Sequence, residues 1–253
     1  MIKISDISAY IDQIAPYDTK CDWDNCGLLV GENQKEVKKI GFCLDLTSQT
    51  LNNAIENDVD LIITHHPIIF KAQKNFLSGN MAYELAKNGL SAISAHTCYD
   101  VADEGVNDVL AQILGLKNVD TIETDDCVRP MLRVGEVDEM SSVDFAKFVA
   151  KKLGTTVRLV DSGNPVSFVV VCGGAGMSFL NDVNYYGAST FVTGDISHHE
   201  MLEAQELGIN VVAAGHFESE YPAMIFLKEK LAKEFADIQT IMLEQSNPVK
   251  FIY

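Results

Sequence analysis

Short apolar runs alternate with amphipathic stretches along the first half of the chain. A first helix is predicted with Ser5 or Asp6 as its N-cap and Pro16 at its end, with Ile7, Ile11 and Ile14 on one face. The runs and stretches that follow occupy residues 38–46, 47–58, 59–64, 81–89, 90–95 and 104–115. Strands that alternate with helices in this way are typical of a largely parallel sheet covered by helices.

The same alternation returns in the second half, after a less regular stretch at 119–165 with a helix capped by Ser142. Strands are predicted at 131–137, 155–160, 166–174, 189–194, 209–215, 238–244 and 250–253. Helices are predicted near 179–187, at 197–208 and from Pro222 through Phe235. No Gly/Ser linker interrupts the chain, so we expect two tightly joined α/β halves, 1–125 and 126–253.

Histidines and acids occur at matching places in the two halves. Each half has a His-His pair before a helix and a His-x-x-x-acid ending after the next strand: His65–His66 and His96 to Asp100 in the first, His198–His199 and His216 to Glu220 in the second. We infer an internal duplication in which equivalent strand ends face each other across a shared cleft. The few matching residues leave a chance similarity as the alternative.

The carboxyl ends of parallel strands are where α/β proteins build their sites, and two His-x-x-x-acid endings there favour a metal centre. Imidazole with carboxylate suits Zn, Fe or Mn, and Asp100 or Glu220 could bridge two ions roughly 3.5 to 4 Å apart. His65 and His66 would point to opposite sides of a straight strand, so each could hold a different ion. Pro67 ends that strand.

Other roles stay open for some of these residues. Glu220 lies just before Pro222 and could be an acid of a helix N-terminus. His96 could bind metal, orient another group or act as a general acid, and we expect an orienting or proton-transfer role. A solvated or lining role is expected for His198 and His199.

Charge and cysteine usage narrow the class of protein. The chain has 36 acidic and 19 basic residues, a formal net charge of -17, which disfavours non-specific binding to nucleic acid or anionic lipid. The six cysteines form no CxxC pair, and Cys43 and Cys172 lie in apolar runs where burial is expected. No signal peptide and no run of about eighteen apolar residues is present, so a cytoplasmic location without membrane contact is expected.

Five segments resemble the NIF3-like family, whose bacterial members are commonly labelled GTP cyclohydrolase 1 type 2 homologues: 23–31 (WDNCGLLVG), 63–70 (ITHHPIIF), 96–108 (HTCYDVADEGVND), 192–210 (VTGDISHHEMLEAQELGIN) and 215–220 (GHFESE). The resemblance runs from end to end and is closest to the shorter bacterial form. It implies two divalent metal ions per chain, held by His65, His66, Asp100, His216 and Glu220. It also implies two similar α/β halves that exchange terminal strands, and a homo-oligomer, often a hexameric ring.

The leading interpretation is a dinuclear metal-dependent hydrolase, in which two cations activate a water and His96 transfers protons. The family label implies a nucleotide such as GTP as the small-molecule substrate, although no P-loop is present. A metal-binding interaction or regulatory protein without turnover is the alternative from another class. A dinuclear phosphoesterase is a variant within the enzyme class. Five ligands for two ions would leave open positions, which favours catalysis.

Overall fold

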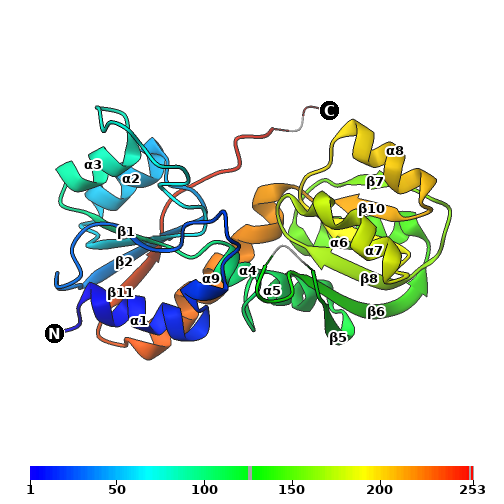
Figure 1. Cartoon of the computed structure of the whole chain (residues 1–253), viewed down its shortest axis with the longest axis horizontal. Coiled ribbons are helices and arrows are strands. Elements are labelled where there is room, and N and C mark those ends of the chain that lie inside the picture. The colour runs from blue at the N-terminus through cyan, green and yellow to red at the C-terminus, as the bar shows by residue number, and fades with distance from the viewer. Residues whose placement is uncertain (125–126, 251, 253) are drawn as a thin grey trace. The chain divides into compact units, whose positions relative to one another are not determined.

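The computed structural model describes residues 1–124, 127–250 and 252, and divides into two compact units (Figure 1). Unit 1 comprises Met1–Asp103 and Ala223–Pro248, and unit 2 comprises Glu104–Pro222 with the last residues of the chain. The units therefore do not follow the expected single boundary at 125/126. The reason is that the segment after 222 returns to unit 1, whereas residues 104–124 pack with unit 2.

Unit 1 is built on a five-stranded sheet in the order β1-β4-β3-β2-β11. Strands β2, β3, β4 and β11 are parallel, and β1 runs antiparallel to β4 at the edge. The elements are α1 (Ile4–Ile14), β1 (Gly27–Val30), β2 (Lys39–Cys43), α2 (Ser48–Glu56), β3 (Leu61–Thr64), α3 (Met81–Lys87), β4 (Ser91–Ser94), α4 (Thr97–Asp100) and β11 (Gln239–Met242), with a 3-10 turn at Tyr17–Thr19. Strand β11 comes from the C-terminal part of the chain, as expected for an exchanged terminal strand (Figure 1).

Unit 2 is built on a six-stranded sheet in the order β5-β6-β8-β9-β10-β7. Its elements are α5 (Val106–Leu114), β5 (Lys117–Ile122), β6 (Leu132–Met140), α6 (Ser142–Leu153), β7 (Arg158–Val160), β8 (Val166–Cys172), α7 (Leu180–Tyr185), β9 (Thr190–Thr193), α8 (His198–Glu206) and β10 (Asn210–Ala213), with a 3-10 turn at Gly176–Phe179. Helix α9 (His216–Glu234) begins in unit 2 and continues into the sequence of unit 1.

The two units share the topology of four strands, which agrees with an internal duplication, and differ beyond them, where β11 is parallel to β2 but β6 is antiparallel to β8. In each, three adjacent parallel strands follow one another with helices between them, β2-β3-β4 in unit 1 and β8-β9-β10 in unit 2. In each, a short strand that precedes them in the chain pairs antiparallel with the last of the three, β1 with β4 and β7 with β10.

Burial follows from this architecture. Every residue of the four central strand segments β3, β4, β9 and β10 is buried, as in parallel sheets that are covered on both faces. Ile62 and Leu85 belong to the core of unit 1, and Phe145 and Val171 to that of unit 2. Cys43 and Cys172 are buried, as the sequence predicts.

Several predicted boundaries are shifted. Helix α1 begins at Ile4 with Lys3 as its N-cap, at least two residues earlier than a cap at Ser5 or Asp6 implies. Ser141 rather than Ser142 caps α6 by accepting the Asp144 N–H at 3.1 Å. Helix α9 begins at His216 and contains Pro222 in its interior. An interior proline removes one helix hydrogen bond and its ring crowds the carbonyl of residue i−4, which is why a helix start at Pro222 was expected, yet α9 continues on both sides of it. The predicted strand at 250–253 falls largely outside the described residues.

Candidate metal centre

Polar side chains of unit 1 gather where three adjacent parallel strands end. Each of the three strands is followed, two residues after its end, by one of these side chains: β2 by Asp45, β3 by His66 and β4 by His96. Because these strands are neighbours in the order β4-β3-β2, their carboxyl ends bring the three side chains to one edge of the sheet.

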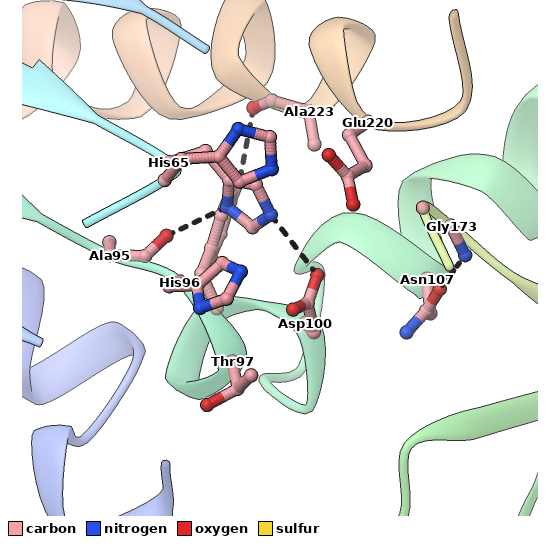
Figure 2. A network of polar contacts seen from close by, with 12 residues as sticks. His65, Ala95, His96, Thr97, Asp100, Asn107, Gly173, Glu220 and Ala223 are labelled. Carbon is pink, nitrogen blue, oxygen red and sulfur yellow. Dashed lines mark hydrogen bonds and ion pairs between the residues drawn. The ribbon is translucent and has the colours of Figure 1, made fainter. Parts of the chain in front are cut away.

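Three histidine rings form a cluster at this edge. The ring centroid of His65 lies 5.1 Å from that of His66 and 5.1 Å from that of His96, and the His66 and His96 centroids are 5.5 Å apart. Each ring offers one nitrogen, and these nitrogens lie within 4.8 Å of one another. His65 and His66 are not forced to opposite sides, because β3 ends at Thr64 and the pair lies beyond the pleated backbone. Figure 2 shows His65 and His96 from close by.

All three rings are oriented through Nδ1. The His65 Nδ1 lies 2.9 Å from the Ala95 carbonyl oxygen, and the His66 Nδ1 lies 2.7 Å from Asp45 Oδ1. The His96 Nδ1 lies 2.9 Å from Asp24 Oδ1. In a neutral imidazole, the nitrogen that faces a carbonyl or carboxylate oxygen carries the proton, so the lone pair is on Nε2.

Asp24 is a buried carboxylate that joins His96 to helix α4. Its Oδ2 accepts the Thr97 backbone N–H at 3.0 Å and the Thr97 hydroxyl at 2.5 Å. Burial acts to raise the pKa of Asp24, but the hydrogen bond and charge of His96, helped by Thr97, outweigh it and hold the pKa well below its usual range. Asp24 is therefore an ionised acceptor that fixes the orientation of His96.

Asp100 is placed by the short helix α4. Its Oδ1 lies 3.5 Å from the His65 Nε2, and the residue is 8% exposed. The preceding residue, Tyr99, is buried and donates its hydroxyl hydrogen to the Ala223 carbonyl oxygen at 3.1 Å. This buried contact ties α4 to the part of α9 that belongs to unit 1.

In unit 2, the residues of the site likewise lie at the carboxyl ends of three adjacent parallel strands, and a carboxylate orients the histidine. Gly174 and Asp195 follow β8 and β9 by two residues, and His216 follows β10 by three. The His216 Nδ1 lies 2.6 Å from Asp195 Oδ2, and its Nε2 lies 3.2 Å from Glu220 Oε2, one helical turn further along α9. The hydrogen bond to Glu220 raises the pKa of His216 to about 9, against the effect of burial and with help from Asp195. Asp195 also lines a cavity of about 360 Å³ together with Arg158.

Two consecutive glycines make room for the carboxylate of Glu220, which is 4% exposed. A Cβ at Gly173 would lie 3.2 Å from the Glu220 Cγ. A Cβ at Gly174 would lie against the Glu220 carboxylate and 3.1 Å from the His216 Nε2. Gly174 also has φ +62°, a left-handed conformation that favours glycine.

Each unit thus brings together its own share of the residues singled out in the sequence: His65, His66, His96 and Asp100 in unit 1, and His216 and Glu220 in unit 2. His198 and His199 are exposed at the start of α8. They are not the counterparts of His65 and His66, as their order in the sequence had implied, because the residues after the matching strand end are Gly194 and Asp195.

Three oxygen acceptors at the site histidines, Asp24, Asp45 and Asp195, were not predicted from the sequence. A usable signal existed for two of them, since Asp45 and Asp195 lie at the carboxyl ends of β2 and β9, two residues after the last residue of each strand. Asp24 reaches His96 across 72 positions of the chain, and no local pattern shows such a contact.

Among the described residues, none of the helices combines the length and apolar character needed to cross a bilayer.

The chain is similar to known proteins over nearly its whole length. The model of the family described as Duf34/NIF3 (NGG1p interacting factor 3) matches residues 2–248. A GTP cyclohydrolase 1 type 2 homolog of Clostridium perfringens is 32% identical over 263 residues, which cover 99% of this chain and 100% of the relative. The crystal structure of Staphylococcus aureus hypothetical protein SA1388 has a TM-score of 0.91 at 28% identity, covering 99% of both chains. Reduced HcgD from Methanocaldococcus jannaschii has a TM-score of 0.86 at 30% identity, covering 96% of this chain and 98% of that protein.

Proposed function

The chain belongs to the Duf34/NIF3 family, and from this premise we propose that it is a hydrolase that depends on two divalent metal ions. The proposed ligands are His65, His66 and Asp100 of unit 1, and His216 and Glu220 of unit 2. Imidazole and carboxylate donors suit Zn, Fe or Mn. Two such ions, when bound, would supply Lewis acidity that activates water and neutralises charge developing on the substrate.

The observation that carries this proposal is the shared orientation of four imidazoles. The Nδ1 of His65, His66, His96 and His216 each faces a carbonyl or carboxylate oxygen at 2.6 to 2.9 Å. Metal-binding histidines are held in this way, because the second hydrogen bond fixes the tautomer and the ring and makes Nε2 a better ligand. Packing alone does not require the same arrangement four times.

We assign His96 a proton-transfer role beside the ligands. Asp24 holds its Nδ1–H, so Nε2 can accept a proton from the attacking water and return it to the leaving group. His96→Ala should then keep nearly full metal occupancy but lose turnover by roughly 10²- to 10⁴-fold. His216→Ala should lose metal. If His96→Ala loses an ion as readily as His216→Ala does, His96 is a ligand and this assignment is wrong.

For the substrate, we propose a nucleotide such as GTP, opened hydrolytically in its purine ring. Support comes from relatives named GTP cyclohydrolase 1 type 2 homolog. The test is a panel of nucleotides and phosphodiesters offered to metal-loaded and chelator-treated protein, with products identified by mass spectrometry. Metal-dependent formate release from GTP is expected. Cleavage of phosphodiesters alone would identify a phosphoesterase, and no turnover by fully metal-loaded protein would favour the interaction or regulatory role.

We further propose that the chain works in the cytoplasm as a homo-oligomer, most simply the hexamer that the family resemblance implies. Its formal net charge of -17 supports a small-molecule substrate rather than non-specific nucleic-acid binding. Light scattering at micromolar concentration tests the assembly, and a monomer mass would contradict it.

A further inference from the structure

Two large aromatic side chains of unit 1 remain exposed beside His96. Trp23, the chain's one tryptophan, is 56% exposed, and Phe70 is 46% exposed. Their ring centroids lie 5.7 Å apart and their planes are tilted by 52°, so one ring can stack flat on a planar ligand while the other contacts its edge. Both stand steeply to the imidazole of His96, with centroid distances of 5.9 Å at 72° for Trp23 and 6.4 Å at 77° for Phe70. The pair therefore borders the histidine cluster.

The backbone around this pair is tied down on both sides. The Asn25 Nδ2 donates to the Ile69 carbonyl oxygen at 2.7 Å, which links the residues that adjoin the two rings. Asp24, between Trp23 and Asn25, is buried and bound to helix α4 through the Thr97 N–H at 3.0 Å. The rings are thus presented from a fixed position, and their exposure is a built feature of this edge.

The exposed area indicates the size of the occupant. An aromatic side chain can bury roughly 150 to 250 Å², so the exposed parts of Trp23 and Phe70 together offer roughly 200 Å². A stable protein interface needs about 800 Å² from each partner. A single flat ring, in contrast, is well served by two aromatic side chains, because base stacking on such rings is favourable whatever the base.

We propose that Trp23 and Phe70 are a stacking platform for a flat heteroaromatic ring of the purine type, carried by the molecule that reacts at the histidine cluster. The proposal rests on the proposed function for the reaction, but it assigns a binding role that needs no metal. A ring held on this platform lies within reach of His96, whose imidazole centroid is 5.9 Å from the Trp23 ring and 6.4 Å from the Phe70 ring. The platform would therefore determine which substrates are presented to the cluster.

The test uses the full chain, treated with chelator, and guanosine as the probe, with ribose as the probe that lacks the ring. Trp23 reports binding directly, because no other tryptophan contributes to the emission. Guanosine should quench this emission saturably, and ribose should not. Equilibrium dialysis of guanosine then compares Trp23→Leu and Phe70→Leu with the control Phe76→Leu. Phe76 is 49% exposed and lies in the same 66–80 segment.

The expected result is a dissociation constant for guanosine raised roughly 5- to 150-fold in Trp23→Leu, the equivalent of 1 to 3 kcal/mol of stacking, and at least about 5-fold in Phe70→Leu. Phe76→Leu should change it less than about twofold. Equal quenching by ribose, or equal affinity in all three variants, would overturn the platform. So would a Trp23→Leu chain that only changes its oligomeric mass, since the rings would then face a second copy.

Binding and turnover separate this proposal from the proposed hydrolase. If guanosine binds and the leucine variants weaken it, the platform stands even when metal-loaded protein turns over nothing in the panel. If the metal-loaded protein hydrolyses a nucleotide and Trp23→Leu leaves its KM unchanged, the hydrolase stands and the platform is refuted.

Discussion

Replacing Asp24 with asparagine tests the claim that a buried, ionised carboxylate holds His96 in place. The Asp24 side chain is fully buried, and its two oxygens accept from His96 Nδ1 and from both the N–H and the hydroxyl of Thr97. An amide of the same shape has one acceptor oxygen only, so its NH₂ group must face a donor on one side. Losing hydrogen bonds to a charged, buried acceptor should cost about 3 kcal/mol in the free energy of unfolding.

The cost should also depend on pH. The pKa of Asp24 is lower in the folded chain than the value of about 3.9 for an unfolded aspartate, so its stabilisation is fully present above about pH 4 and declines as pH falls. The difference between wild type and Asp24→Asn should therefore be smaller by about 1 kcal/mol at pH 3 than at pH 7.

Urea unfolding of chelator-treated protein, followed by the emission of Trp23, measures the free energy of unfolding of unit 1, which contains both Trp23 and Asp24. Asp22→Asn is the matched control, because Asp22 is exposed in the same segment. A loss for Asp24→Asn of under about 1 kcal/mol, or one that equals the control and does not change with pH, would refute the reasoning.

The remaining predictions concern unit 2. In chelator-treated protein, His216 should titrate near pH 9 by NMR, because Glu220 raises its pKa from 6.5. Its protonated form should stabilise the fold fully below about pH 6.5 and progressively less as pH rises through about 9; a titration unchanged in Glu220→Gln would count against the pair. Gly174→Ala should displace the Glu220 carboxylate and lower metal occupancy. Gly187→Ala, at φ +78° with nothing within 4 Å of the added Cβ, should cost only backbone strain, and equal metal loss in both variants would contradict the steric argument.

The sequence predicts the central parallel strands and most helices because their apolar periodicity reflects burial directly. All residues of β3, β4, β9 and β10 are buried, and their short segments of apolar and small residues are recognisable in the sequence. Strand β5 was not predicted, because five of its six residues are exposed and its pairing with β6 is irregular. The return of β11 to β2 joins segments about 200 positions apart, which no local pattern can show.

For the site, the histidines and their i+4 acids could be predicted because strand ends and short spacings mark them. The partners that orient the rings could not, because Asp24 to His96 and Asp45 to His66 are contacts between separate strands or loops. The supposed match of His198–His199 with His65–His66 failed for a related reason. The order of the sequence motifs suggested that His198–His199 corresponds to His65–His66. In the structure, the residues that follow β9 as His65 and His66 follow β3 are Gly194 and Asp195.

Metal content per chain, measured by elemental analysis after repletion with Zn, Mn and Fe, tests the central claim most directly in wild type, Glu220→Gln and Glu218→Gln. The two variants make the same chemical change on helix α9, but only the Glu220 carboxylate is held 3.2 Å from the His216 Nε2. The account predicts about two ions per wild-type chain, a clear loss in Glu220→Gln and wild-type content in Glu218→Gln. No metal above background in the wild type, or equal loss in both variants, would contradict it.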